Sequence, residues 1–359
     1  MRAQLLAAGV ALAALAGCGG DDPEPAAQRA PASAKTDLGP VKDYLLEHTT
    51  RLQGDTAKLA SQADDYHALA KSVGFDYSKL LAGHRDELAR LVRDMQKTYS
   101  DANPAYEEME GVVAGVPSLA DFDVIIDAGS DKSDPENAVP FSIKTPAGKT
   151  FEQPGNFFFL VETALWGTEP AFAAKGVEPD LDGDGEVTFG EAVPDADFLV
   201  AAAKDFARNA KELDEAARAW QPTEQDAFTA LVVMTPTMSE YFEAWKNSRF
   251  VAGGKAKEST FVAASRLQDI AGILNGLVLV YDSVEPSVRE ASAQQAKQTG
   301  SDLENLHEFA VTLRDKEAAG KRFTAAEADT LGSDAQDRAE AIAGQISQAA
   351  GELGIKLES

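Results

Sequence analysis

The chain has 359 residues, and acidic residues outnumber basic ones by 59 to 33, which gives a formal net charge of -26. This length is sufficient for a large buried core. A protein of this charge repels polyanions, so we expect no nucleic-acid partner. Cys18 is the single cysteine, which excludes an internal disulfide and a multi-thiolate metal site.

Residues 1–18 are predicted to be a lipoprotein signal peptide. Met1-Arg2 precedes an apolar run from Leu5 to Ala16 that is too short to span a bilayer. The run ends in Leu-Ala-Gly-Cys18, which resembles the lipobox of bacterial lipoproteins. The resemblance implies cleavage before Cys18 and attachment of lipid to its sulfur. We therefore expect membrane attachment through this N-terminal lipid.

The residues after Cys18 predict where the anchored protein lies. Gly19 follows the cysteine, and this is not a clear signal for retention in the inner membrane. We expect a cell-envelope protein on the outer membrane facing the periplasm, with surface display as the alternative. Residues 19–36 are rich in Asp, Pro and Ala with almost no large apolar residue, which predicts a disordered tether.

Apolar residues at helical spacing dominate the rest of the chain, and alternating strand patterns are not evident. The sequence predicts an all-α fold of two fused bundles over 37–355, with halves at about 37–167 and 195–355. The predicted helices cover about 37–73, 77–100, a short helix opened by Pro104, 157–166, 195–220, 223–248, 259–283, 286–316 and 324–353. Thr324-Ala-Ala-Glu327 forms a capping box at the start of the last one.

The segment from Gly115 to Pro154 has a different composition. It contains five prolines and several Gly and Asp residues, so we expect a long irregular insertion with a short hairpin around Phe141 to Phe151. Loops of this length in compact domains are usually functional or inserted. One hypothesis is therefore an interaction module in which this segment binds another envelope protein.

The stretch from Asp180 to Glu191 has the ligand spacing of an EF-hand calcium loop. Ca²⁺ takes six to eight oxygen ligands, and alternate side chains of a tightly curled loop converge on one point. Gly185 at position 6 permits the sharp turn. The predicted calcium ligands are Asp180, Asp182, Asp184, Glu186 through its carbonyl, Thr188 and Glu191. The alternative is a solvated acidic turn.

The flanks of this loop qualify the prediction. Pro179 and Pro194 leave room for only a short entering helix, at Ala171 to Lys175. Val187, at position 8, is apolar and is expected to anchor the loop to the protein beneath it. We predict a single structural calcium site that clamps the junction between the two helical halves, rather than a paired calcium sensor.

Four stretches together resemble the imelysin-like family of bacterial periplasmic and lipid-anchored proteins. They are Phe157 to Gly167, Ala219 to Phe250, Ser265 to Tyr281, and Tyr106 to Glu110. The resemblance covers about residues 37–355. It implies an all-helical fold of two bundles, an exported location and a link to iron uptake. Some relatives carry a metallopeptidase label because of a His-x-x-Glu pair on a Gly-x-His-x-x-Glu helix that ends in Leu-Trp-Gly.

This chain departs from that motif. Aligned on Glu162, the histidine position is Phe159, which cannot ligate a metal. Glu162 is the candidate for a second metal site, holding iron or zinc; the alternative is a structural role, with Arg249 or Arg266 as partner. We predict a non-enzymatic protein that binds Ca²⁺ and a metal or small ligand between its bundles. The alternative is a metallopeptidase-like enzyme that uses Glu162.

Overall fold

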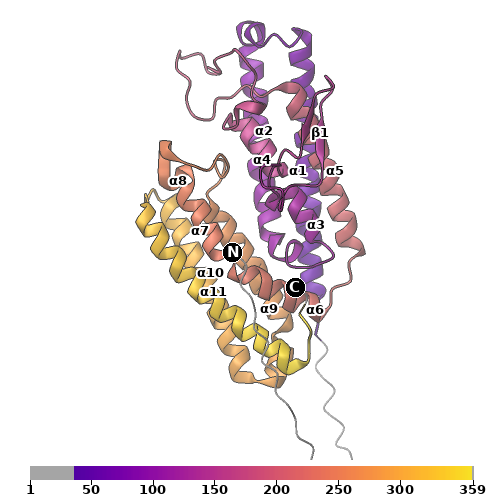
Figure 1. Cartoon of the computed structure of the whole chain (residues 1–359), viewed down its shortest axis with the longest axis vertical. Coiled ribbons are helices and arrows are strands. Elements are labelled where there is room, and N and C mark those ends of the chain that lie inside the picture. Colours follow the sequence, from indigo (N-terminus) through magenta and orange to yellow (C-terminus); the bar gives the residue numbers. More distant parts are fainter. Residues whose placement is uncertain (1–35, 358–359) are drawn as a thin grey trace, which may run out of the picture. The chain divides into compact units, whose positions relative to one another are not determined.

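The computed structural model describes residues 36–357, which form an all-α fold with one small two-stranded sheet (Figure 1). The predicted signal peptide, Cys18 and all of the predicted tether except Thr36 lie outside the described residues. The elements follow in the order α1 (Gly39–Ser72), α2 (Tyr77–Val113), α3 (Ala120–Asp123), the π-helix η1 (Val124–Ala128), β1 (Ser142–Lys144), β2 (Thr150–Glu152), α4 (Phe157–Trp166), η2 (Pro170–Phe172), α5 (Ala196–Ala219), α6 (Glu224–Met234), η3 (Thr235–Thr237), α7 (Met238–Asn247), α8 (Arg249–Ala252), η4 (Gly253–Lys255), α9 (Arg266–Ala291), α10 (Ala293–Ala318) and α11 (Ala325–Leu353).

Helices α1, α2, α4 and α5 form the first bundle. Helix α1 packs along both α2 and α5, and α4 packs against α2 and α5 (Figure 1). Leu45, Leu52, Leu59 and Tyr66 recur every seven residues on α1 and are fully buried. Two helical turns separate neighbours in this series, so all four lie on the side of α1 that faces the other helices.

Helices α7, α9, α10 and α11 form the second bundle, with α6 packed against α9 and α11. Trp245 lies fully buried in it and donates its indole N–H to Oε1 of Glu317 at 2.9 Å. Helix α9 is the one helix among the described residues that is long and apolar enough to cross a membrane. Because 61% of its most apolar 18-residue stretch is buried within the protein, this helix is a core helix here.

The expected division of the bundles at the acidic loop does not follow the packing. Helix α5, which comes after the loop, packs with α1 and α4 of the first bundle. Two helix starts were also wrong. Pro104 lies inside α2 and Pro286 lies inside α9. A proline removes one backbone hydrogen bond from a helix, and the tertiary packing of these long helices overrides that local cost.

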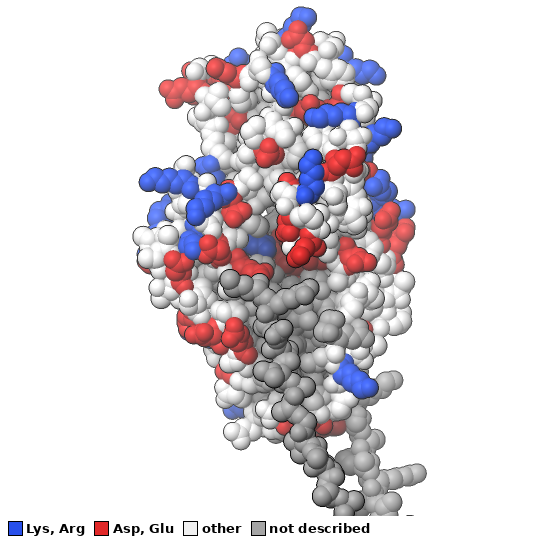
Figure 2. Space-filling view, in the orientation of Figure 1, with Lys and Arg blue, Asp and Glu red and all other residues white. Residues whose placement is uncertain are grey.

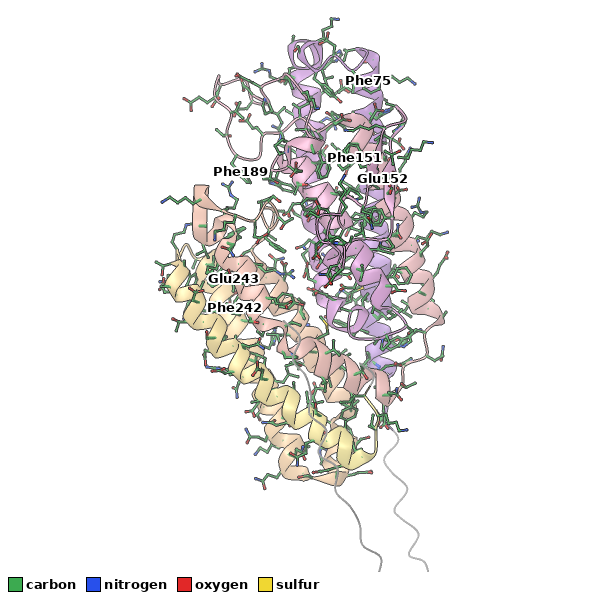
Figure 3. All side chains as sticks on the ribbon, viewed as in Figure 1. Phe75, Phe151, Glu152, Phe189, Phe242 and Glu243 are labelled. Atoms are coloured by element: carbon green, nitrogen blue, oxygen red, sulfur yellow. The ribbon has the colours of Figure 1, made fainter. Side chains whose placement is uncertain are left out.

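The insertion from Gly115 to Pro154 contains more regular structure than its composition suggests. The expected hairpin is confirmed: β1 and β2 pair antiparallel, with Ile143 opposite Phe151. The ring of Phe151 packs on Phe198 of α5, with centroids 4.8 Å apart (Figure 3). Helix α3 and the π-helix η1 precede the hairpin, and both contact the first bundle.

Charged residues on the surface are arranged mainly as short-range pairs. Exposed pairs one helical turn apart include Arg90 with Asp94 and Lys97 with Asp101. Lys and Arg are interspersed with Asp and Glu on the face shown in Figure 2. Exposed pairs of this kind contribute little to stability, so the two bundles depend on their apolar cores.

The two bundles meet where α2 crosses α9, and glycines permit the close approach. A Cβ atom added to Gly276 of α9 would lie 2.5 Å from the backbone oxygen of Glu108 on α2. A Cβ atom added to Gly111 of α2 would lie 2.9 Å from Cδ2 of Leu277. This crossing brings polar residues at the start of α9 against α2.

We expect Gly276→Ala to lower the free energy of unfolding by about 1–3 kcal/mol, because the new methyl group forces the two backbones apart. Gly54→Ala, on the exposed side of α1 with open space around it, is the matched control. It should raise stability by about 1 kcal/mol through helix propensity alone. Urea denaturation measures both, and a Gly276→Ala protein as stable as wild type would contradict the close-packing argument.

Candidate metal centre

A cavity of about 350 Å³ lies among α2, η1, the start of α4 and the segment that precedes α9. Buried and half-buried carboxylates of α2, η1, α4 and α9 face it or lie directly beside it. Its lining comprises Tyr99, Asn103, Glu107, Asp127, Ala128, Gly129, Ser130, Asp131, Ser133, Asp134, Gly155, Asn156, Phe158, Phe159, Glu162, Thr260, Phe261, Ala264 and Asp269.

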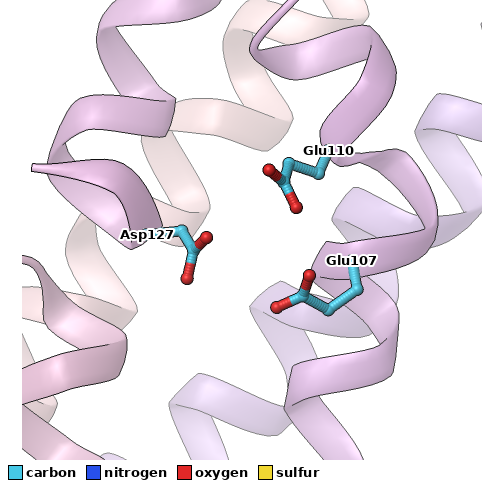
Figure 4. A group of neighbouring side chains, drawn as sticks. All are labelled: Glu107, Glu110 and Asp127. Carbon is cyan, nitrogen blue, oxygen red and sulfur yellow. The ribbon is translucent and has the colours of Figure 1, made fainter. Parts of the chain in front are cut away.

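Glu107, Glu110 and Asp127 form a compact acidic cluster, in which one oxygen of each lies within 4.8 Å of the others (Figure 4). Glu107 and Glu110 are three residues apart on α2 and therefore project from the same face. Both are buried, with 1% and 4% of their surface exposed, and Asp127 is half-buried. The cluster thus presents three carboxylates, largely removed from water, to one point.

Asp127 reaches this point because of the π-helix η1. The N–H of Gly129 donates to the carbonyl of Val124 at 2.9 Å and closes the wide turn. A Cβ atom on Gly129 would overlap that carbonyl oxygen, so the position requires glycine. Asn156 caps α4 by accepting from the N–H of Phe159 and donates from Nδ2 to the carbonyl of Gly129 at 3.0 Å. Asn156 therefore ties η1 to α4.

Donors from α2 and from the second bundle orient the two glutamates. Glu107 accepts from Nδ2 of Asn103 at 2.9 Å and from Nη1 of Arg266 at 3.2 Å. Oε1 of Glu110 accepts from the hydroxyl of Tyr241 at 2.8 Å. Oε2 of Glu110 is buried without a hydrogen-bond donor. A buried carboxylate oxygen without a partner is costly, and a cation beside it would remove that cost.

Arg266 is the buried cation of this region. Its guanidinium packs against the rings of Tyr241 and Phe261, with its carbon 4.5 and 4.6 Å from their centroids. Nη1 donates to Glu107 and also to Asp269 at 3.2 Å. Oδ1 of Asp269 is a second buried oxygen without a donor. One guanidinium therefore faces several carboxylates. This excess of buried negative charge is what a divalent cation would neutralise.

The pKa values of these acids reflect the same imbalance. Burial raises the pKa of Glu107 well above its usual range, and the neighbouring Asp269 carboxylate adds to the effect. Burial raises the pKa of Asp127 in the same way, with Glu110 as the largest charge contribution. The pKa of Asp269 rises to about 6 through burial, although Arg266 opposes the change. In the absence of a bound cation, these shifts of the pKa favour the protonated forms of Glu107, Asp127 and Asp269.

Glu162 lines the same cavity but has a different environment. It is 3% exposed, and its two oxygens accept from the backbone N–H groups of Phe261, Val262 and Ala263 at 2.8, 2.9 and 2.9 Å. Burial raises its pKa to about 7, and these three hydrogen bonds oppose the rise. The partners are thus backbone donors.

Neither arginine that we considered as a partner contacts Glu162. Arg266 binds Glu107 and Asp269, and Arg249 lies over the ring of Phe189, 3.1 Å from its centroid. Phe159 lies in the cavity wall at the position where the imelysin-like motif has histidine. The four histidines, all within the described residues, lie elsewhere: His48 beside Glu108, His67 beside Asp197, His84 beside Glu87, and His307 in a separate groove.

The predicted calcium loop brings the side-chain oxygens of Asp180, Asp182 and Asp184 within 4.8 Å of one another. Gly185 has a positive φ of 90°, as the turn requires. Both oxygens of Glu191 accept hydrogen bonds within the loop, from the N–H groups of Leu181, Asp182 and Thr188. The N–H of Thr188 is the largest cause of a pKa of Glu191 below its usual range.

The expected short entering helix is the 3-10 helix η2, at Pro170–Phe172 and thus slightly earlier than Ala171 to Lys175. The expectation that Val187 anchors the loop was wrong. Val187 is 49% exposed, and Leu181, at 4% exposed, is the residue that anchors the loop. The loop also extends toward the second bundle, because Phe189 packs against Arg249 of α8 (Figure 3). Glu186 and Thr188 are exposed.

The fold and the cavity define a class: an all-α protein of two bundles with a carboxylate cluster beside their crossing. The model of the imelysin family, described as peptidase M75, matches residues 45–348, and the chain belongs to this family. No curated protein matches the chain. Family membership supports the expected link to iron uptake.

The residues of the acidic cluster were not singled out as ligands by sequence reasoning. Glu107 and Glu110 share the three-residue spacing that places two carboxylates on one helical face, and this signal was available. Asp127 follows the apolar run Val124 to Ile126 in a segment that was interpreted as irregular. Asp269 lies in the family-like stretch from Ser265 to Tyr281, and Arg266 was considered as a partner of Glu162, but their spacing carries no indication of a shared site.

The raised pKa of Asp123 can be tested through the pH dependence of the protein's stability. Its pKa rises to about 7 through burial and the nearby Glu110, although it accepts a hydrogen bond from Tyr106 at 2.6 Å. A carboxyl group whose pKa is higher in the folded protein binds more protons when folded, so the contribution of Asp123 to stability is greatest below about pH 4 and falls as the pH rises toward 7. We expect the urea midpoint of the chelator-treated protein to fall over this interval.

Asp123→Asn is the matched variant, because its amide oxygen still accepts from Tyr106 and carries no titratable proton. The decline of the urea midpoint between pH 4 and 7 should be shallower in this variant than in wild type. Identical slopes for the two proteins would show that Asp123 does not titrate as its burial indicates.

Proposed function

We propose that this chain is a non-enzymatic, lipid-anchored protein of the cell envelope that binds a divalent metal ion at Glu107, Glu110 and Asp127. The observation that carries the proposal is the buried Oε2 of Glu110, which has no donor and lies beside two further carboxylates. A cation held there would receive hard oxygen ligands only. An all-oxygen site suits Mn²⁺ and Fe²⁺ better than Zn²⁺, which proteins usually bind through nitrogen and sulfur ligands.

Family membership supports iron as the physiological metal. The predicted N-terminal lipid would place the site in the envelope, where such an ion is encountered. The nearby Asp269, with its unpartnered Oδ1, is available to orient water on the ion. Arg266 would reduce the net charge of the cluster and so favour reversible binding over permanent retention.

The non-enzymatic part of the proposal rests on Phe159 and Glu162. A peptidase of the kind expected from a His-x-x-Glu pair needs an imidazole ligand and a free carboxylate. Phe159 supplies no ligand, and the carboxylate of Glu162 already accepts three backbone hydrogen bonds. The chain therefore lacks both the imidazole ligand and the free glutamate that the His-x-x-Glu pair would provide.

The metal site is tested by Glu110→Gln in the full chain carrying Cys18→Ser, Asp180→Ala and Glu191→Ala, which removes the predicted lipid and the predicted calcium site. We expect the affinity for Mn²⁺, and for Fe²⁺ under anaerobic conditions, to fall at least about tenfold, because a charged ligand is lost from a desolvated site. Isothermal titration measures the change.

Glu108→Gln is the matched control, since Glu108 is the neighbour of Glu107 on α2 and its carboxylate lies beside His48. Equal affinities in the Glu110→Gln and Glu108→Gln proteins would overturn the assignment. Loss of binding in Glu162→Ala together with full binding in Glu110→Gln would instead move the metal to Glu162 and restore the peptidase hypothesis.

We further propose that the loop from Asp180 to Glu191 binds one structural Ca²⁺ ion. The convergence of Asp180, Asp182 and Asp184 supports this proposal. Titration with Ca²⁺ should give a stoichiometry of one that disappears in Asp180→Ala/Glu191→Ala. The full set of ligands is partly exposed, so the affinity should be in the weak range typical of extracellular calcium modules. Equal heats from the two proteins would contradict it.

A further inference from the structure

We propose that Glu162 is a positioning residue for the metal centre: its carboxylate binds three consecutive backbone N–H groups and thereby fixes Phe261 against Arg266. The inference rests on the proposed metal site at Glu107, Glu110 and Asp127. It gives Glu162 a function that does not involve contact with the metal.

The first step is the geometry around the carboxylate. Oε2 accepts from the N–H of Phe261, and Oε1 accepts from those of Val262 and Ala263. Successive N–H groups that converge on one point form an anion-binding concavity. Phe261 has a φ of 53°, a left-handed conformation that is unfavourable for a bulky residue. The surrounding contacts must therefore hold it, and Glu162 supplies the anion that does so.

The second step is the rigidity of the support. Glu162 lies in α4, whose N-terminus is capped by Asn156. At the other end of α4, the hydroxyl of Thr168 donates to the carbonyl of Ser259 at 2.7 Å. The segment between η4 and α9 has no regular secondary structure, and α4 thus binds it at two places. The start of the segment is also held by α7, because the N–H groups of Lys257 and Glu258 donate to the carbonyl of Asn247. Residues 261–263 are held by the carboxylate of Glu162.

The third step connects this segment to the metal centre. The ring of Phe261 packs against the Arg266 guanidinium, with its centroid 4.6 Å from the guanidinium carbon, and the ring of Tyr241 lies 4.5 Å from the same carbon. Nη1 of Arg266 donates to Glu107, and the hydroxyl of Tyr241 donates to Glu110. A shift of Phe261 would free the guanidinium on one side, and Glu107 would lose a fixed donor. Glu162 therefore acts on the metal ligands through Phe261 and Arg266.

The experiment uses chemical rescue in the full chain with Cys18→Ser. Glu162→Ala leaves a space the size of a carboxylate next to three N–H groups, and formate can occupy it. In metal-free protein, we expect amide hydrogen exchange at residues 261–263 to accelerate at least about tenfold, the equivalent of one or two lost hydrogen bonds. Added formate should restore protection there, and exchange in α11 should not change.

Mn²⁺ affinity is the second readout. It should fall about tenfold in Glu162→Ala and recover with formate. Phe261→Ala, which keeps the three N–H groups but removes the ring over Arg266, should lower the affinity to a similar extent without recovery in formate. Affinity unchanged in Phe261→Ala would overturn the connection through Arg266.

Glu162→Gln guards against a variant that fails to fold, because it preserves the volume of the side chain. Its single amide oxygen cannot accept all three bonds, so exchange at 261–263 should rise and formate, which has no space to enter, should not reverse it. Unchanged exchange in both Glu162 variants would refute the positioning role. Wild-type protein that binds no Mn²⁺ would refute the proposed function instead, and the exchange result would still decide whether Glu162 holds the segment.

Discussion

The burial of Arg266 is the constraint on which the rest of the site depends. Carboxylates from α2 and α9 can be removed from water only where a cation and hydrogen-bond donors accompany them. Arg266 supplies that cation, and it is held by two aromatic rings and two carboxylates. The close crossing of α2 and α9 at Gly111 and Gly276 brings these groups together. One guanidinium does not balance the cluster, which is why raised pKa values and unpartnered oxygens remain.

Two buried glutamates illustrate how the supply of donors decides the role of a side chain. Glu110 receives one hydroxyl, so one of its oxygens is left for a cation. Glu162 receives three backbone N–H groups, so its charge is already stabilised within the protein. Both are acidic, buried and close to the crossing of the bundles. The number of hydrogen-bond donors, rather than residue type or burial, distinguishes Glu110, the proposed metal ligand, from Glu162, the proposed positioning residue.

The acidic loop and the buried cluster are oxygen sites of different kinds. The loop is largely exposed, and its carboxylates accept from the loop's own N–H groups and, at Asp180, from Nη1 of Arg85 at 3.3 Å. A cation bound there would therefore displace solvent and local donors at little desolvation cost. The cluster is largely buried, and each unpaired oxygen is costly. The loop borders the second bundle through the contact of Phe189 with Arg249. None of the residues that line the cavity comes from this loop.

Local interactions made the helices predictable from the sequence. The seven-residue series on α1 and the capping box of Thr324 and Glu327 involve residues within two turns of one another, and the structure confirms both. The metal centre was not predictable in this way. Arg266 lies 159 residues from Glu107, and the N–H of Phe261 lies 99 residues from Glu162. Periodicity determines which face of a helix is buried, whereas only the tertiary crossing of α2 and α9 determines which buried charges meet, because that contact is made between segments remote in the chain.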